Sequence, residues 1–246
     1  MIYFISDAHL GSRVIADKRK HEQHLTAWLD FVKTDATAIY MLGDMFDFWF
    51  EYKTTAPKGY VRFLGKIAEL ADKGIEIHFF TGNHDIWTFG YLENEIGLKV
   101  HRTSEVIKIG NKNFYLAHGD LEHDESRSFR FMTSIFHNKT AQKLFAFLPA
   151  NWGQEFGYRW SEHNRRRENE EENAFKGEDG ENIILFSKKY AETHPEIDYF
   201  IYGHRHILVD ILIFEKKRVI ILGDFISLFT YGKFDGEDFM LEHFLP

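Results

Sequence analysis

The sequence predicts an α/β fold in which Asp and His side chains lie just after the ends of the strands. Five short apolar runs are typical of strands buried on both faces, and helical patterns separate the first three of them. A motif rich in Asp and His directly follows each run. The five runs cover residues 2–5, 38–42, 75–80, 114–117 and 199–202.

Helical patterns between these strands cover residues 21–33, 60–73 and 87–95. Gly74 directly follows the second pattern and predicts its end, because glycine readily adopts the left-handed conformation of a helix C-cap. A turn at residues 110–113 separates the strand at 114–117 from another at 106–109. This pair predicts a β-hairpin.

The segment of residues 121–180 interrupts the regular alternation. Phe129, Met132 and Phe136 repeat at helical spacing, and so do apolar residues at 144–148. Two interpretations stay open: helices that bury only their shared seam, or an apolar cap over the crevice at the strand ends. No repeat, low-complexity tract or linker occurs, so we expect a single domain over residues 1–246 with a helical cap inserted at 121–180.

Three arginines at residues 165–167 precede an acidic run at 168–172. Such a charge run is usually a solvated helix face or a loop, although arginines at the base of the cap would suit bidentate phosphate binding. The next predicted helix, at 181–193, stops before Pro195. Short strands then follow at residues 207–214, 218–222, 228–233 and 239–244, and the short turns between them predict antiparallel pairs.

The motifs after the five strands supply metal-binding side chains. Residues just past the carboxyl ends of neighbouring strands converge on one crevice of an α/β sheet. Each motif alone is weak evidence, because Asp-x-His and Gly-Asp are short and common, but their ordered occurrence predicts one shared site. The motifs are Asp7-Ala8-His9, Gly43-Asp44, Gly82-Asn83-His84-Asp85, His118-Gly119-Asp120 and Gly203-His204-Arg205-His206.

Mixed imidazole, carboxylate and amide ligands suit divalent Mn, Fe, Zn or Co. Two such ions about 3.5–4 Å apart promote hydrolysis of phosphate esters, because they lower the pKa of water and neutralise the phosphoryl oxygens. A bridging carboxylate screens the repulsion between the ions, and we assign this role to Asp44. We assign one ion to Asp7, His9 and His206, and the other to Asn83, His118 and His204.

His84 directly follows a predicted ligand and is poorly placed to bind the same ion. We therefore expect it to contact the transferring phosphoryl group or to protonate the leaving oxygen. Asp47 lies three residues after the bridging carboxylate and is expected to orient the His84 imidazole, with a simple turn carboxylate as the alternative. Asp85 is expected to be structural.

Composition excludes several classes of protein. The net charge of −8 argues against a nucleic-acid partner. The absence of Cys excludes disulfides and thiolate chemistry, and it fits a reducing compartment. The first strand begins at residue 2, and no run of about 18 apolar residues occurs, so we expect neither a signal peptide nor a membrane span. We expect a cytoplasmic protein, either free or peripherally bound to a membrane.

The motif set resembles that of the calcineurin-like metallophosphoesterase superfamily, which carries D-x-H, G-D-x-x-D, G-N-H-D, an H-G-D histidine and G-H-x-H. The resemblance spans Asp7 to His206. It implies an α-β-β-α sandwich, in which helices flank two mixed sheets, here with the inserted helical cap. Because members of the superfamily act on many phosphate esters, the resemblance implies a reaction class and leaves the substrate open.

Longer stretches, at residues 6–11, 43–49, 81–87, 158–167 and 203–206, resemble a narrower family, the UDP-2,3-diacylglucosamine diphosphatases of lipid A biosynthesis. That family implies cleavage of a UDP-lipid pyrophosphate to UMP and 2,3-diacylglucosamine 1-phosphate, with Mn²⁺ as the usual metal. It implies an enzyme peripheral to the cytoplasmic face of the inner membrane, whose cap binds the acyl chains. The substrate contacts that it implies are Asn83, His84, Asp124, Ser161, Arg165 and His204.

One position departs from the best-known branch of that family, which has Arg where this chain has His84. This departure leaves the substrate less certain than the chemistry. Two other functions stay open. One is a soluble nucleotide or sugar-phosphate phosphodiesterase or pyrophosphatase whose aromatic cap stacks a base. The other is a non-catalytic scaffold that keeps the fold and has lost its metals. The sequence leaves the oligomeric state undetermined.

Overall fold

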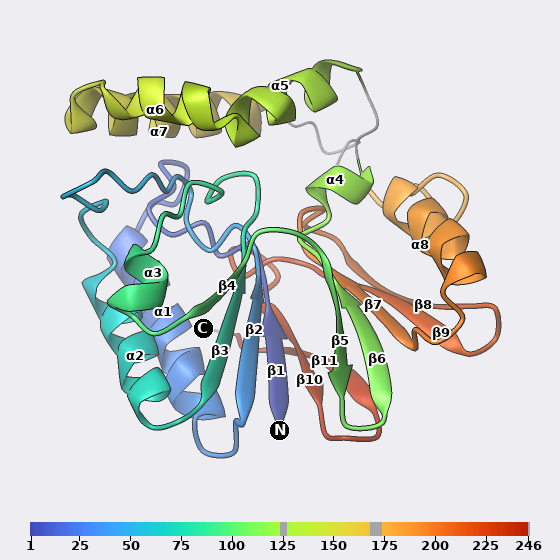
Figure 1. Ribbon diagram of the computed structural model, residues 1–246. Coiled ribbons are helices and arrows are strands. Elements are labelled where there is room, and N and C mark those ends of the chain that lie inside the picture. Colours follow the sequence, from blue (N-terminus) through green and yellow to red (C-terminus); the bar gives the residue numbers. More distant parts are fainter. Residues whose placement is uncertain (124–126, 168–173, 246) are drawn as a thin grey trace.

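The computed structural model describes residues 1–123, 127–167 and 174–245, without the side chains of residues 123, 127–130 and 164–167. In this part of the chain, two β-sheets pack face to face and helices cover their outer faces (Figure 1). The expected α-β-β-α sandwich is therefore confirmed.

Parallel strands carry the predicted motifs. In the described residues, the first sheet has the strand order β11-β10-β1-β2-β3-β4 and the second has the order β5-β6-β7-β9-β8. Strands β1, β2 and β3 are parallel, and so are β6 and β7, so their carboxyl ends share an edge within each sheet. The strands are β1 Ile2–Ile5, β2 Ala38–Leu42, β3 Glu76–Phe80, β4 Lys99–His101, β5 Glu105–Ile109, β6 Lys112–Leu116, β7 Tyr199–Tyr202, β8 Leu208–Ile213, β9 Lys217–Leu222, β10 Thr230–Phe234 and β11 Phe239–His243.

Three apolar layers hold the sandwich together. Between the sheets, the Phe4 ring stacks on Tyr40 and Phe114, at centroid distances of 5.2 and 5.9 Å. The outer face of the first sheet packs on helices α1 and α2, and that of the second sheet packs on α8. Both faces of the central strands are thus buried, which explains their continuous apolar runs.

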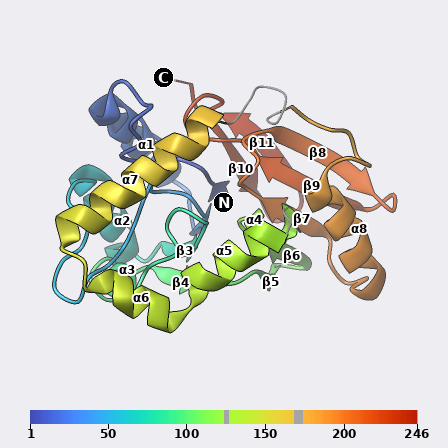
Figure 2. The ribbon, with the colours of Figure 1, turned by 90° about the horizontal axis from the view of Figure 1, so that it is seen from above.

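The helices are divided between these outer faces and a group at one end of the sandwich. Figures 1 and 2 show α5, α6 and α7 lying across the end at which the motif strands terminate. The helices are α1 Lys18–Val32, α2 Val61–Asp72, α3 Tyr91–Asn94, α4 Asp120–His123, α5 Arg127–His137, α6 Lys139–Ala146, α7 Ala150–Arg167 and α8 Asn182–Thr193. No helix in the described residues is long and apolar enough to cross a bilayer.

Helix α7 is a structural feature that the sequence pattern did not define. Its residues are rich in aromatic side chains and end in a run of charge, and Gly153 and Gly157 weaken a helical pattern. A Cβ atom at Gly157 would lie 2.4 Å from the Phe48 ring, and one at Gly153 would lie 2.1 Å from the Tyr52 hydroxyl. The two glycines therefore allow α7 to pack closely on the segment that follows β2.

The prediction of a helix at residues 87–95 is wrong for residues 87–90. Only Tyr91–Asn94 are helical, because the preceding residues form extended contacts with the segment after β2. Trp87 forms an isolated parallel bridge with Phe50, and its carbonyl accepts a hydrogen bond from the Glu51 amide at 3.1 Å. Tertiary pairing therefore overrides the local helical preference in this segment.

A buried ion pair ties the loop after β7 to the start of α8. The Arg205 guanidinium donates to both carboxylate oxygens of Glu181, at 3.1 and 3.0 Å, and also to the Ala174 carbonyl at 3.3 Å. The Glu181 side chain is fully buried and the Arg205 side chain is 7% exposed. Two parallel hydrogen bonds of this kind fix the position of Arg205 within its loop.

Removing one partner of this pair would leave the other charge buried and uncompensated. We therefore expect Glu181→Ala to lower the free energy of unfolding by about 3–5 kcal/mol in urea denaturation. The control is Lys188→Ala on the same helix, which removes a more exposed pair with Glu178 and should cost less than about 1 kcal/mol. Equal costs for the two variants would contradict the structural importance given to the buried pair.

Candidate metal centre

Metal-binding side chains from both sheets converge where β1, β2, β3, β6 and β7 end. Three overlapping groups of side chains occur in the described residues. Each side chain offers one ligand atom, and the ligand atoms within a group all lie within 4.8 Å of one another. These groups are Asp7, His9 and His206; Asp7, Asp44 and His118; and His9, Asp44 and His84. Because the groups share members, they form one continuous site rather than separate clusters.

The first group surrounds the carboxylate that follows β1. Asp7 Oδ1 lies 3.6 Å from His9 Nε2 and 3.4 Å from His206 Nε2. The rings of His9 and His206 stack with their centroids 5.2 Å apart. This is the set of side chains that the sequence assigns to one ion.

The side chains assigned to the other ion lie around His118. Its Nε2 atom is 3.4 Å from Asp44 Oδ2 and 3.2 Å from Asn83 Oδ1, and the His204 ring lies 5.1 Å from the His118 ring. The same Asp44 oxygen lies 3.6 Å from His9 Nε2. Asp44 therefore faces both groups, which is the position of a bridging ligand. We call these seven residues the donor cluster: Asp7, His9, Asp44, Asn83, His118, His204 and His206.

The donor cluster suits divalent cations. Atoms that share an ion at bond lengths of about 2.0–2.2 Å lie about 3–3.5 Å apart, close to the separations found here. Asp7 is fully buried, and within the described part of the chain its Oδ1 atom accepts no hydrogen bond. A buried carboxylate oxygen without a partner is costly, and a bound cation removes that cost.

Strained backbone is concentrated in the same residues. Asp7, His9 and Asp44 have φ angles of 52°, 42° and 53°, and His204 and His206 have φ angles of 66° and 51°. They are five of the nine non-glycine residues with positive φ in the described chain. Such a conformation costs roughly 1–2 kcal/mol per residue, so the surrounding structure must hold these side chains in place.

Glycines allow the motif loops to approach one another. A Cβ atom at Gly82 would lie 2.2 Å from Asp44 Oδ1, and one at Gly203 would lie 2.5 Å from Asp7 Oδ2. Any larger residue would therefore displace a donor carboxylate. This close approach explains why glycine directly precedes Asn83 and His204 in the two motifs.

Neighbouring groups orient the imidazoles. His118 Nδ1 contacts the Leu42 carbonyl at 2.8 Å, so it carries the proton and leaves Nε2 for a metal. His206 Nδ1 lies 3.4 Å from Asp224 Oδ2. Asp224 is not among the residues that the sequence predicts for the site. Its other contacts are to backbone amides and to Ser227 just after it. The Gly223-Asp224 pair resembles an ordinary turn, so no local signal distinguishes it.

Asp85 is structural, as expected. Its carboxylate accepts hydrogen bonds from the backbone amides of Gly82, Asp44 and Phe46 at 2.8–3.3 Å. It thereby fixes the loop after β2 against the loop after β3. Burial and the nearby Asp44 charge raise the pKa of Asp85 to about 7.

Opposite charges stabilise the ionised form of Asp44. Burial opposes ionisation, yet the imidazoles of His118 and His84 lower the pKa of Asp44 well below its usual range. Burial likewise opposes protonation of His118, but the Asp44 carboxylate raises the pKa of His118 well above its usual range. Burial raises the pKa of Asp7. The centre therefore attracts positive charge, which divalent cations would supply while leaving the histidines neutral.

His84 lies at the edge of the donor cluster, with Nε2 4.0 Å from Asp44 Oδ2. The expectation that the Asp47 carboxylate orients this ring is wrong. His84 Nδ1 instead donates to the Asp47 backbone carbonyl at 2.8 Å, and Asp47 Oδ1 lies 3.8 Å from His9 Nδ1. The carbonyl only accepts a hydrogen bond, so it fixes the His84 proton on Nδ1 and leaves Nε2 facing the site.

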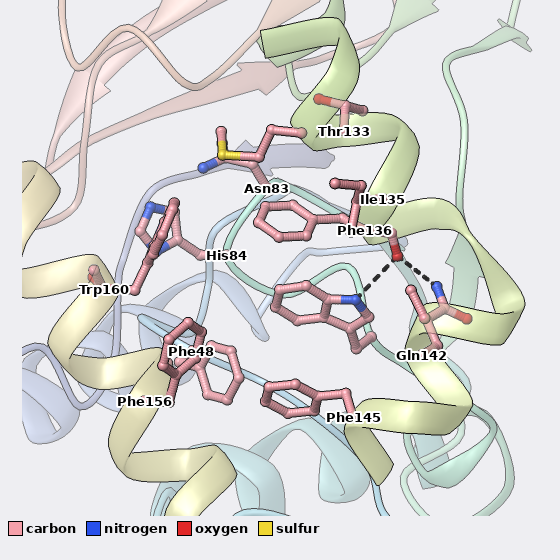
Figure 3. A pocket seen from close by; sticks show the side chains of 15 residues that line it. Phe48, Asn83, His84, Thr133, Ile135, Phe136, Gln142, Phe145, Phe156 and Trp160 are labelled. Carbon is pink, nitrogen blue, oxygen red and sulfur yellow. Dashed lines mark hydrogen bonds between the residues drawn. The ribbon is translucent and has the colours of Figure 1, made fainter. Parts of the chain in front are cut away.

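An apolar cavity of about 200 Å³ adjoins this edge (Figure 3). Asn83 and His84 line one side, and side chains of α5, α6 and α7 line the other. Figure 3 shows His84 facing the same space as the aromatic rings. The described lining residues are Phe48, Asn83, His84, Trp87, Met132, Thr133, Ile135, Phe136, Ala141, Gln142, Phe145, Phe156, Gly157, Trp160 and Ser161.

The residues expected to contact substrate do not all lie in one place, and two of them fall wholly or partly outside the described residues. Ser161 lines the cavity, is 1% exposed, and its hydroxyl has no hydrogen-bond partner within the described residues. Asn83, His84 and His204 lie in or beside the donor cluster. Asp124 falls outside the described residues, and so does the side chain of Arg165, whose backbone belongs to α7.

This chain is similar to known phosphoesterases in sequence and in fold. The pattern of the calcineurin-like phosphoesterase family matches residues 1–208. A protein of Porphyromonas gingivalis named UDP-2,3-diacylglucosamine hydrolase is 44% identical over 98% of this chain and 96% of its own length. One of the same name from Neisseria meningitidis (strain Z2491) is 31% identical over 61% of each chain.

Among solved structures, a dimetal phosphatase from Danio rerio covers 98% of this chain and 94% of its own, with 15% identity and a TM-score of 0.48. The family match covers the loops that carry the donor cluster, from Asp7 to His206. This chain belongs to the calcineurin-like phosphoesterase family.

Proposed function

We propose that this protein hydrolyses the pyrophosphate of UDP-2,3-diacylglucosamine to UMP and 2,3-diacylglucosamine 1-phosphate. The observation that carries the proposal is the position of the apolar cavity directly beside the donor cluster. Asn83 belongs to the cluster, His84 lies at its edge, and both residues line the cavity. A substrate that places a pyrophosphate beside acyl chains matches this juxtaposition. The 44% identical relative named UDP-2,3-diacylglucosamine hydrolase supports the same substrate.

In this proposal, the donor cluster holds two divalent ions, with Mn²⁺ as the preferred metal. Asp7, His9 and His206 would hold one ion, Asn83, His118 and His204 would hold the other, and Asp44 would be shared between them. When bound, such ions lower the pKa of water and neutralise the charge that develops on the phosphoryl oxygens. The amide and imidazole ligands suit Mn²⁺ and would also accept Fe, Zn or Co.

His84 would act on the reacting phosphoryl group. The Asp47 carbonyl fixes its Nδ1 proton, so its Nε2 faces the space between the donor cluster and the cavity. From there, Nε2 in its protonated form would donate a hydrogen bond to a phosphoryl oxygen or a proton to the leaving oxygen. Asp47 would thus be a positioning residue that acts through its backbone.

The helices at residues 121–180 would form a cap within a single domain. Its aromatic cavity would take the acyl chains, and the hydroxyl of Ser161 would contact the glucosamine phosphate. Asp124 and Arg165 would join this contact. Side chains on α5, α6 and their connection to α7 are exposed and apolar, with Phe131, Leu144 and Phe147 at 70%, 65% and 86% exposure. They support peripheral attachment to the cytoplasmic face of the inner membrane, from which the lipid would enter.

The substrate assignment is tested by comparing UMP release from UDP-2,3-diacylglucosamine and from UDP-glucose in the presence of Mn²⁺. We expect a much higher kcat/KM for the lipid, because UDP-glucose leaves the apolar cavity unfilled. Equal rates would remove the lipid argument and favour a nucleotide-sugar phosphodiesterase. A protein that binds no Mn²⁺ in metal analysis would favour a non-catalytic scaffold.

Asp44→Ala should lose both ions and all measurable turnover, because one carboxylate faces both groups of ligands. The measurements are metal content per chain after dialysis and UMP release. Asp72→Ala, which changes an exposed carboxylate at the end of α2, is the control and should keep both. Normal metal content in the Asp44 variant would refute its bridging role.

His84→Ala should lower kcat by about 10²–10⁴ while the metal content stays at the wild-type level. The reason is that His84 is proposed to contact the phosphoryl group rather than to bind an ion. His243→Ala, at an exposed position of β11, should leave both quantities unchanged. A near-normal kcat for His84→Ala would overturn its assigned role, and loss of metal would reassign it as a ligand.

A further inference from the structure

The break between α5 and α6 is fixed by one carbonyl group. The Phe136 carbonyl lies in the last turn of α5, where carbonyls have no partner within the helix. It accepts hydrogen bonds from Gln142 Nε2 at 2.8 Å and from Trp87 Nε1 at 3.2 Å, both drawn as dashed lines in Figure 3. Asn138 then starts α6 by capping the amides of Thr140 and Ala141. One of the bonds at this break thus comes from outside the two helices.

That outside bond comes from the loop of the metal centre. Trp87 lies three residues after His84 in the loop that follows β3. The Trp87 carbonyl accepts from the Glu51 amide, and the His84 carbonyl accepts from the Trp49 amide, both at 3.1 Å. Because both ends of this short stretch pair with the same neighbouring segment, the indole keeps a fixed position relative to His84.

Ring packing strengthens the same connection. The Trp87 ring meets Phe136 of α5 edge to face at 5.2 Å, and it lies nearly parallel to Phe145 of α6 at 6.4 Å. On its loop side it packs against Phe48 at 5.4 Å. Aromatic pairs of this geometry add about 0.5–1.5 kcal/mol beyond the area they bury. Trp87 is therefore the point at which the metal loop meets both helices.

Trp87 also lines the cavity itself, between its two walls. Asn83 and His84 line the side next to the donor cluster, while Met132, Phe136 and Phe145 line the helical side. The bond from Trp87 to the Phe136 carbonyl joins these two walls. An acyl chain must fit between them while its pyrophosphate reaches the donor cluster, whereas a substrate without acyl chains has no use for the helical wall.

We propose that Trp87 is a positioning residue that determines specificity for acylated substrates by holding the α5–α6 break against the metal loop. This inference rests on the proposed function. The indole N–H acts through the Phe136 carbonyl and not on the reacting atoms. Its effect should therefore fall on substrate binding more than on the chemical step.

Trp87→Phe tests this role, because it keeps an aromatic ring and removes the N–H donor. In detergent micelles with Mn²⁺, we expect KM for UDP-2,3-diacylglucosamine to rise about 5–10-fold, the loss of one net hydrogen bond, while kcat changes less than KM. Gln142→Met removes the other donor to the same carbonyl from within α6, so its KM should rise less. Trp152→Phe, at a 71% exposed position on α7, is the matched control and should keep the wild-type KM.

The outcomes separate the possibilities. A larger KM effect for Trp87→Phe than for Gln142→Met supports the link between the helices and the metal loop. Equal effects would show that only the stability of the helix break matters, and they would overturn the inference, as would an unchanged KM in Trp87→Phe. Failure of the wild-type protein to cleave the lipid at all would instead overturn the proposed function, and the inference with it.

Discussion

The carboxylate of Asp44 lies between His9 and His118, and many of the surrounding interactions hold it in this position. A buried charge is costly unless opposite charge and hydrogen bonds surround it. Here the His84 amide donates to Asp44 Oδ1 at 2.9 Å, and bound divalent cations would supply the opposite charge. The backbone at Asp44 is itself strained, with a φ of 53°, and Asp85 fixes it through the Asp44 amide. The rigid sandwich offsets these costs, because loops between buried strands have little freedom to relax.

The site needs both sheets. Asp7, Asp44 and Asn83 follow strands of the first sheet, and His118 and His204 follow strands of the second. The aromatic layer between the sheets therefore sets the distance between the two halves of the donor cluster. The ion pair between Arg205 and Glu181 contributes in the same way. Arg205 lies between His204 and His206 in the sequence, and its side chain is anchored to Glu181 at the start of α8. The stability of the sandwich and the geometry of the donor cluster thus depend on the same contacts.

A single short loop connects the donor cluster with the apolar cavity. Asn83 belongs to the donor cluster, His84 faces both the cluster and the cavity, and Trp87 packs on α5 and α6. The glycines of α7 allow this helix to approach the segment after β2, and Phe48 and Gly157 at this contact both line the cavity. The cavity therefore has walls on segments that are far apart in the sequence and has a fixed place beside the donor cluster.

Local sequence determined the buried strands and the Asp and His side chains that meet at their ends. Strand periodicity and ligand chemistry are properties of a few adjacent residues, so Asp7, His9 and Asp44 could be recognised without coordinates. Only the tertiary structure decided that β10 and β11 join the first sheet beside β1, while β8 and β9 join the second. It also decided that Asp47 orients His84 through its carbonyl, that Asp224 faces His206, and that Trp87 reaches Phe136. These features arise from packing between distant segments, and no residue pattern within any one segment encodes them.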